Sequence, residues 1–248
     1  MLIGWLAAGV PARFTVVDPV ITEVPANVRL LREVPAERFD VVLLGVKPQM
    51  LNEAASAVAP VMTGETLLLS LLAGAELASL AARFPVNGGI VRVMPNLAAA
   101  IGKSPIGLFA AGLSEPARAA VIALMAPLGP PEWLASEDQL DAVTALAGSG
   151  PAFVYRFIAA LADGGAALGL EPAQAQRLAL TMVEGAAALA AAAGAPPAEL
   201  ARRVTSAGGT TAAGLAVLDH DAALIRLVAD TLRAARDRGA ELAAAARG

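Results

Sequence analysis

Short, continuous apolar runs recur through the first half of the sequence and constrain its fold more than any other feature. Because these runs are continuous rather than alternating, they are typical of strands in a parallel sheet that is covered on both faces. Helix-compatible stretches, such as Met50–Val61 and Leu77–Phe84, separate them. The pattern predicts an α/β fold with a doubly wound parallel sheet. The predicted strands are Phe14–Val17, Val41–Val46, Thr66–Leu72, Ile90–Met94 and Ile106–Ala110.

The second half of the sequence differs, because nearly all of its patterns are helical. Ser136-Glu137-Asp138-Gln139 is typical of a capping box that opens a helix. The final segment, Ala222–Ala246, places Leu224, Leu227, Val228 and Leu232 on one helical stripe. Small residues dominate these helices, which therefore cannot each bury a face within one small domain. We expect an α/β domain over residues 1–136, followed over residues 137–248 by an all-α domain that forms a homodimer or a higher homo-oligomer.

The composition excludes several classes of function. A formal net charge of −4 leaves no basic stripe for nucleic acid, and aromatic residues, at 4%, are too sparse for base stacking. The chain has no cysteine, which excludes thiolate nucleophiles, disulfides and thiolate metal sites. No other pattern indicates a metal. We therefore predict neither a nucleic-acid partner nor a metal centre.

A mean hydropathy of +0.64 raises the question of a membrane protein. The apolar runs are short, however, and charged residues at Lys47, Glu65, Glu76 and Arg92 interrupt them, so that none approaches a spanning length. The opening segment, Met1–Val10, is apolar but lacks the basic residues of a signal peptide. We predict a cytoplasmic protein without a membrane partner.

A glycine segment near the end of the chain, Val204–Leu215, is the first candidate for a binding site. Gly208 and Gly209 precede two hydroxyl residues, Thr210 and Thr211, and an apolar helical run follows. This order predicts free backbone N–H groups at a helix N-terminus, which can hold a carboxylate or a phosphate. The alternative is a helix cap after a flexible turn, and the local pattern by itself favours that alternative.

A second glycine segment, Gly148-Ser149-Gly150-Pro151, lies inside a helical pattern. Proline lacks a backbone N–H, so the helix must break or kink there. Such a kink frees backbone groups and lets another group approach closely. A simple helix–helix turn explains the same residues and is favoured by this segment alone.

Three predicted strands end in residues that are compatible with a ligand. Ligands of doubly wound sheets bind at the carboxyl ends of strands, where all three of these segments should lie. Lys47 could contact a phosphate or an amide there, although a solvated loop lysine is the plainer interpretation. The segments are Gly45-Val46-Lys47-Pro48, Leu72-Ala73-Gly74 and Met94-Pro95-Asn96.

Several segments together resemble the pyrroline-5-carboxylate reductase family along nearly the full length of the chain. Their order and spacing match as well as their residues. Ala207 departs from the family pattern, because relatives commonly have proline there, but the change removes no functional group. The matching segments are Gly45–Gln49, Arg92–Asn96, Asp141–Phe153, Ala162–Leu170 and Val204–Asp219.

The resemblance implies a Rossmann-type domain that binds NADPH or NADH and a helical domain that interlocks with a second subunit. The substrate, 1-pyrroline-5-carboxylate, would be bound by Ser206, Gly208, Gly209, Thr210 and Thr211 and reduced to L-proline, with Thr211 as the catalytic hydroxyl near the ring nitrogen. The implied cofactor-binding residues are Asp18, Gly45, Val46, Lys47, Pro48, Leu72, Ala73, Gly74 and Asn96.

One part of the family pattern is missing from the sequence. A dinucleotide site needs a first strand and a Gly-x-Gly-x-x-Gly turn, and the chain contains no such turn. Its opening, Gly4–Val10, is similar to the end of the family's first helix, and Phe14–Asp18 is similar to the second strand. Either the start was assigned at an internal methionine, which we favour, or the chain is an inactive oligomerising form that lacks a cofactor.

Asp18 bears on the choice of cofactor. A carboxylate at the end of the second strand can bind a ribose 2′-hydroxyl and repels a 2′-phosphate, which favours NADH over NADPH. Arg32, where relatives often have asparagine, could offset that repulsion. The alternative is that Asp18 is only a turn residue before Pro19.

Two further interpretations are set aside. His220, the single histidine, lies between two aspartates in a helix-linking turn, and we predict a surface residue. A related imine or β-hydroxyacid reductase is the other interpretation. The β-hydroxyacid type would rely on a catalytic lysine after the sheet domain, and the helical half contains no lysine.

Overall fold

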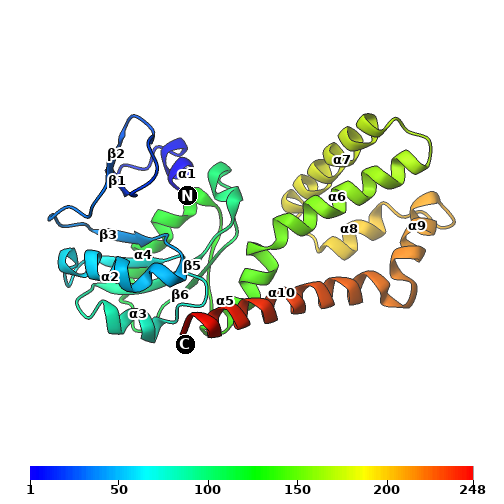
Figure 1. Cartoon of the computed structure of the whole chain (residues 1–248). Helices are drawn as coiled ribbons and strands as arrows, with labels where there is room; N and C mark the ends of the chain where they lie inside the picture. The colour runs from blue at the N-terminus through cyan, green and yellow to red at the C-terminus, as the bar shows by residue number, and fades with distance from the viewer. Residues whose placement is uncertain (248) are drawn as a thin grey trace. The chain divides into compact units, whose positions relative to one another are not determined.

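The chain forms two compact units, which we describe separately. The computed structural model describes residues 1–247, so the last residue of the predicted helical domain, Gly248, lies outside the described residues. The first unit contains Met1–Ser149 together with the last helix from Ala235 onward, and the second contains Gly150–Ala234 (Figure 1).

All five predicted apolar runs form strands in the first unit. Two further strands are present that the apolar pattern did not predict. β2 is short and carries Arg29, and β7 begins at a proline, so neither forms a continuous apolar run. A two-stranded parallel sheet contains β1 (Phe14–Val17) and β2 (Val28–Leu31). A five-stranded sheet contains, in chain order, β3 (Val41–Leu44), β4 (Leu67–Ser70), β5 (Gly89–Met94), β6 (Ile106–Phe109) and β7 (Pro131–Trp133).

One strand departs from the predicted parallel arrangement of the sheet. β6 runs antiparallel to β5, whereas the neighbouring pairs in the larger sheet are parallel. The connection over residues 95–105 contains only the 3₁₀ turn η3 (Leu97–Ile101). A parallel neighbour needs a crossover of about a dozen residues or more, usually with a helix, so this short connection returns the chain in the opposite direction.

The two sheets divide where a first strand would belong. Within residues 1–247, no ladder joins β1 to β3. In the doubly wound strand order 3-2-1-4-5-6, the first strand lies between the second and the fourth. The observed order of β2 and β1, followed by β3, β4 and β5, matches that arrangement without its first strand, as predicted.

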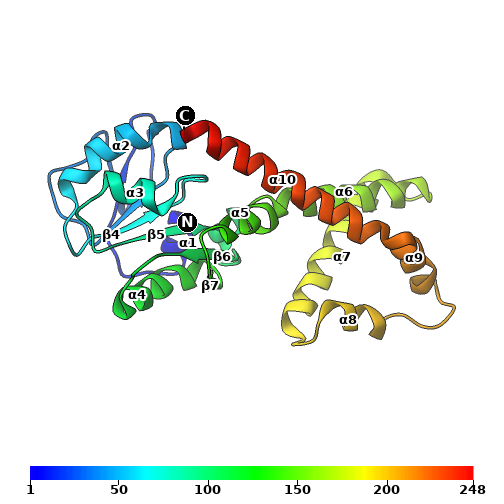
Figure 2. The same ribbon diagram turned by 90° about the horizontal axis from the view of Figure 1, so that it is seen from below.

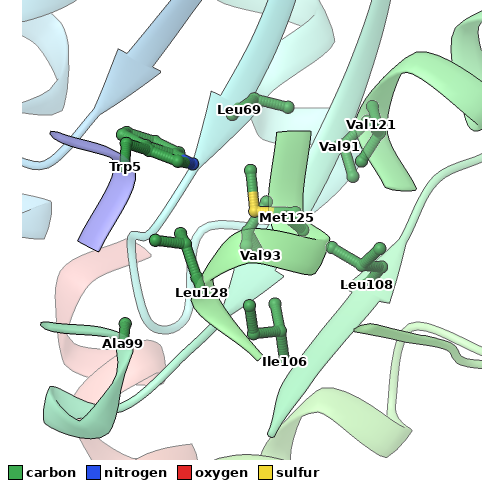
Figure 3. Close-up of a cluster of buried hydrophobic side chains, with 10 residues drawn as sticks. All are labelled: Trp5, Leu69, Val91, Val93, Ala99, Ile106, Leu108, Val121, Met125 and Leu128. Carbon is green, nitrogen blue, oxygen red and sulfur yellow. The ribbon is translucent and has the colours of Figure 1, made fainter. Parts of the chain in front are cut away.

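Helices cover both faces of the larger sheet (Figure 2). Leu68 and Leu69 of β4 are both fully buried, because adjacent side chains point to opposite faces. Leu68 contributes to a core with α2 (Leu51–Val58) and α3 (Leu77–Arg83). Leu69 contributes to a second core with α1 (Leu2–Ala7) and α4 (Glu115–Met125) (Figure 3).

Trp5 anchors α1 in that second core. Its indole Nε1 donates to the Leu124 carbonyl oxygen at 2.7 Å, and its ring stacks on Phe14 with centroids 5.8 Å apart. The indole is therefore buried with its polar group satisfied. These contacts join α1 both to α4 and to the first strand of the smaller sheet.

The predicted break in the helix at the second glycine segment takes the form of a π turn. α5 (Gln139–Val143) continues into the π-helix η5 (Thr144–Gly148), and α6 (Gly150–Ala167) follows. The predicted capping box forms only in part. Gln139 Oε1 accepts from the N–H groups of Ala135 and Ser136, but α5 begins after Asp138 rather than directly after Ser136.

The second unit is helical, as predicted. α6 and α7 pack against each other through small residues, namely Ala162, Ala175 and Ala179. Many of the larger apolar side chains of this unit are exposed, including Phe157, Leu178 and Leu227. After α6, this unit contains α7 (Pro172–Ala192), α8 (Pro197–Arg203), α9 (Thr210–Asp219) and the part of α10 (Ala223–Arg247) that precedes Ala235.

The prediction that no apolar stretch reaches a spanning length is wrong for one helix. Gln139–Ala167 is a continuous helical stretch of 29 residues, and an 18-residue window within it has a mean hydropathy of 1.3. The π turn η5 lies inside this stretch and does not interrupt it. The exposed apolar side chains of this stretch indicate a surface that contacts another protein or a membrane.

Candidate functional site

The N-terminus of α9 carries the predicted substrate residues. Gly208 has φ +70°, a left-handed conformation that glycine adopts without strain, and Gly209 caps the helix with an extended backbone. The first hydrogen bond of the helix runs from the Ala213 N–H to the Gly209 carbonyl oxygen at 3.2 Å. The N–H groups of Thr210 and Thr211 precede that bond and have no intrahelical partner.

Hydroxyl groups surround these amides. A Cβ placed on Gly209 would lie 2.5 Å from Ser206 Oγ, so Ser206 is adjacent to the cap. Thr210, Thr211 and Ser206 are all exposed. The turn therefore gathers all five predicted substrate residues and presents N–H and O–H donors to solvent. Such a set of donors can hold a carboxylate.

The first unit brings most of the predicted cofactor residues to one edge. β3, β4 and β5 are parallel, so the segments Gly45–Pro48 and Leu72–Gly74 and residue Asn96 follow strands that end on the same side. Gly45, Lys47 and Ala73 are exposed there, whereas the Leu72 side chain is buried in the core. Leu72 can therefore meet a ligand only through its backbone.

Asn96 has a structural task that the sequence did not reveal. Its Oδ1 accepts from the Ala98 N–H at 2.9 Å, and its Nδ2 donates to the Ala147 carbonyl oxygen at 3.0 Å. Ala147 lies four residues before Pro151, which has no N–H to offer in an α-helical bond. Asn96 thus supplies a donor where the helix lacks one, and its contact with a cofactor stays a prediction.

Asp18 follows β1 in the smaller sheet, and none of its hydrogen bonds joins it to the other cofactor residues. Its Oδ1 accepts from the N–H groups of Val20 at 2.7 Å and Ile21 at 3.0 Å. These backbone hydrogen bonds, with Ile21 the larger influence, lower the pKa of the Asp18 carboxyl. Arg32 donates to the Asp18 and Ile21 carbonyl oxygens and so closes the same turn. Asp18 therefore holds a turn, and its contact with a ribose stays a prediction.

The turn at Asp18 should respond to acid in a defined direction. Because the folded-state pKa is below the ordinary value of 3.8, the turn is stabilised above that pH and loses this stabilisation as the pH falls through the lower folded pKa. An NMR titration should show the Val20 and Ile21 amide signals shifting together with a midpoint below 3.8. Asp18→Asn should abolish that transition, and a midpoint at or above 3.8 would contradict the assignment.

His220 is on the surface, as predicted. Its side chain is 78% exposed, and its Nδ1 lies 3.3 Å from Asp221 Oδ2. Among residues 1–247, no group of three or more His, Cys, Asp or Glu side chains could hold a metal ion.

The helical half matches a known family. Residues 137–242 match the family model described as pyrroline-5-carboxylate reductase dimerisation. The chain is 40% identical over 205 residues to the pyrroline-5-carboxylate reductase of Pseudomonas aeruginosa, and the aligned residues cover 82% of this chain and 75% of that protein. The chain belongs to the pyrroline-5-carboxylate reductase family. The enzyme of that name from Glycine max is 39% identical over 201 residues, covering 81% of this chain and 71% of its own length.

Solved structures of pyrroline-5-carboxylate reductases have the same fold. The structure from Coxiella burnetii has a TM-score of 0.89 at 29% identity and covers 97% of this chain and 93% of its own. The structure from Plasmodium falciparum, determined with NADP bound, has a TM-score of 0.81 at 23% identity, covering 97% and 92%. The Rossmann-like sheet followed by a helical dimerisation domain is therefore the architecture of this family.

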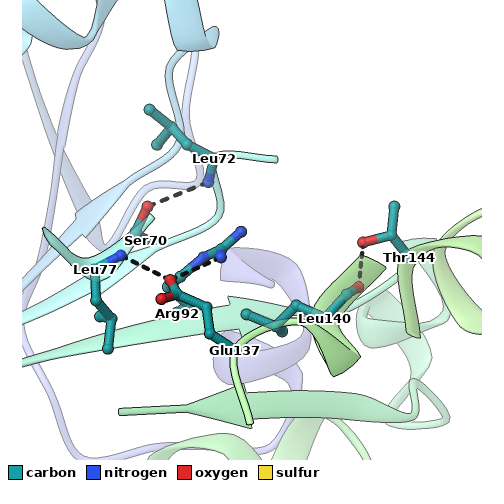
Figure 4. A network of polar contacts seen from close by, with 7 residues as sticks. All are labelled: Ser70, Leu72, Leu77, Arg92, Glu137, Leu140 and Thr144. Atoms are coloured by element: carbon teal, nitrogen blue, oxygen red, sulfur yellow. Dashed lines mark hydrogen bonds and ion pairs between the residues drawn. The ribbon is translucent and has the colours of Figure 1, made fainter. Parts of the chain in front are cut away.

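One polar cluster of this family member escaped the sequence-based assignment of site residues. Arg92 of β5 is buried and forms an ion pair with Glu137, with Arg92 NH1 2.8 Å from Glu137 Oε1 (Figure 4). The same oxygen accepts from the Leu77 N–H at 2.7 Å. The signal was available, because a charged residue inside an otherwise apolar strand needs a partner, but its partner lies 45 residues away.

Proposed function

We propose that this chain reduces 1-pyrroline-5-carboxylate to L-proline with NADPH or NADH. The observation that carries the proposal is the α9 N-terminus, where the N–H groups of Thr210 and Thr211 follow the left-handed Gly208 and face solvent. Membership of the reductase family supplies the substrate class. The nicotinamide, when bound, supplies a hydride to the imine carbon.

The residues of α9 have two tasks in this reaction. The free amides and the Ser206 and Thr210 hydroxyls hold the substrate carboxylate, which fixes the orientation of the ring. The Thr211 hydroxyl orients the ring nitrogen, where the product gains its proton. A neutral hydroxyl can relay that proton without being a strong acid. A protonated imine accepts hydride readily, so alignment is the main demand on the protein.

The residues present fit a nicotinamide dinucleotide in part. The exposed strand ends after β3 and β4 offer backbone groups at Gly45, Ala73 and Gly74, and Lys47 offers a cation for a phosphate. The Gly-x-Gly-x-x-Gly turn that holds a pyrophosphate does not occur in the sequence.

A direct test separates the reductase from the alternative, a cofactor-deficient oligomerising form. Titrating the chain with NADPH and with NADH, while following nicotinamide fluorescence, measures binding independently of turnover. A reductase assay with 1-pyrroline-5-carboxylate should then measure turnover. Turnover supports the reductase. No turnover, with no cofactor bound, supports the alternative.

The preference between the two cofactors depends on Asp18 in this proposal. Its carboxylate is ionised at neutral pH and would repel a 2′-phosphate, so we propose that NADH is preferred. Asp18→Ser should raise the affinity for NADPH relative to NADH about tenfold, the equivalent of about 1.4 kcal/mol. The ratio of the two dissociation constants measures the effect. A wild-type protein that binds NADPH much more tightly than NADH would refute the proposal.

The helical unit supports a homodimer or a higher homo-oligomer. This agrees with the match of residues 137–242 to the family model described as pyrroline-5-carboxylate reductase dimerisation. Its large apolar side chains are exposed in the single chain, with Leu227 66% and Phe157 47% accessible. A partner subunit would remove this surface from water. We propose that this pairing, rather than a lipid bilayer, covers Gln139–Ala167, and that the protein is cytoplasmic without a nucleic-acid partner.

A charge in the exposed face should weaken that pairing. Leu227→Glu places a carboxylate in an apolar interface and should raise the dimer dissociation constant at least about tenfold. Analytical ultracentrifugation measures the change. Val86→Glu is the matched control, because Val86 is 54% exposed but lies in the α/β unit. Equal association of the two variants would place the interface elsewhere.

A further inference from the structure

We propose that Glu137 is a positioning residue for the nicotinamide cofactor. Its carboxylate fixes the turn between β4 and α3, which carries three predicted cofactor residues, Leu72, Ala73 and Gly74. The inference rests on the proposed function, in which this turn contacts the cofactor. Glu137 acts through the turn and needs no contact with the cofactor itself.

The carboxylate caps a helix that is distant in sequence. Glu137 Oε1 accepts from the N–H of Leu77, the first residue of α3, at 2.7 Å (Figure 4). The residue before the helix, Glu76, makes no side-chain cap. Glu137 therefore supplies the acceptor that ends the turn and begins α3, a role that a neighbouring residue usually has.

An arginine holds the carboxylate in place. Arg92 NH1 lies 2.8 Å from the same oxygen, and the Arg92 and Glu137 side chains are only 7% and 26% exposed. Separating the two shielded charges would leave each without compensation, which is unfavourable. The pair therefore keeps its geometry. Arg92 is therefore the rigid support, since its strand is paired on both sides.

The other end of the turn is tied to the same strand pair. Ser70 lies opposite Arg92 in the β4–β5 register, and Ser70 Oγ accepts from the Leu72 N–H at 3.3 Å. Between the two anchors, Gly74 has φ +76° and Ala73 is exposed. The turn is thus held at both ends while its centre presents backbone to solvent. A turn fixed in advance binds a ligand without the entropic cost of ordering it.

Amide hydrogen exchange on the chain without cofactor tests the anchor directly. In Glu137→Ala, the Leu77 amide and its neighbours over residues 71–78 should exchange at least about tenfold faster than in the wild type. Glu137→Gln retains an acceptor oxygen and should recover most of that protection. Val121→Ala is the control for general destabilisation, because Val121 is buried on the opposite face of the sheet. Exchange in the turn that is no faster than in Val121→Ala overturns the inference.

Cofactor binding tests the consequence. In a form that binds NADH or NADPH, Glu137→Ala should raise the cofactor dissociation constant about tenfold and leave kcat at saturating cofactor nearly unchanged, whereas Val121→Ala should change neither. An unchanged dissociation constant in Glu137→Ala overturns the positioning role. A wild type that binds no nicotinamide in any form refutes the proposed function instead, and the exchange experiment still decides whether Glu137 holds the turn.

Discussion

Replacing Gly129 with alanine should destabilise the α/β unit by about 4 kcal/mol, the sum of mid-range costs for backbone strain and for overpacking. Gly129 has φ +135°, and a Cβ there would overlap the backbone of Ser104. Ser104 cannot move freely, because it is fully buried and its Oγ accepts from the Asn96 N–H at 2.8 Å. The cost is a large share of the roughly 5–15 kcal/mol that stabilises a domain. Urea denaturation followed by the fluorescence of Trp5 and Trp133 measures it.

Gly112→Ala is the matched control for this prediction. Gly112 also has a positive φ, +67°, but a Cβ there would meet nothing within 4 Å. Only the conformational cost remains, which is about 1–2 kcal/mol. Equal losses for the two variants would show that the close approach of Gly129 to Ser104 has no energetic effect.

Replacing Thr211 with valine should lower kcat for 1-pyrroline-5-carboxylate about 100-fold, the lower range for loss of a proton-transfer group. Valine keeps the shape of threonine but removes the hydroxyl that orients the ring nitrogen. The cofactor dissociation constant, measured by nicotinamide fluorescence, should stay nearly unchanged. Steady-state kinetics should be recorded in the form of the protein that shows reductase activity.

Two controls accompany the Thr211 variant. Thr211→Ser retains the hydroxyl and should recover most of the turnover. Thr231→Val removes a hydroxyl that donates to the Leu227 carbonyl oxygen within α10, at 2.7 Å, and should leave kcat unchanged. Unchanged turnover in Thr211→Val would count against the assigned role.

Much of the fold could be predicted because its signals are local. The apolar runs of β1, β3, β4, β5 and β6 became strands, with ends that differ by at most two residues from those predicted. α9 begins at Thr210, directly after the glycine pair, because Gly208 can adopt a left-handed backbone that stops one helix before the next begins. The candidate substrate residues were selected for this reason and through the family signature.

The remaining features depend on contacts between distant residues. The direction of β6 follows from the length of the connection before it, which the apolar pattern does not register. Asn96 was predicted to bind the cofactor. Its side-chain amide forms hydrogen bonds with Ala98 and with Ala147, which lies 51 residues away in the sequence. The Arg92–Glu137 pair was likewise not predicted, because the residues next to each of the two in the sequence do not indicate which residue is its partner.

The amino-acid sequence by itself determined the apolar strands and the glycine turn before Thr210, since each depends on the residues at one place in the chain. It also determined the family, because several of its segments match in order and spacing. Only the tertiary structure decided which groups hold that framework together, such as the Glu137 carboxylate on Leu77 and Arg92. The physical reason is that burial and hydrogen bonding act between atoms that are close in space. The partner of a buried charge is therefore fixed by the folded chain and not by its order of residues.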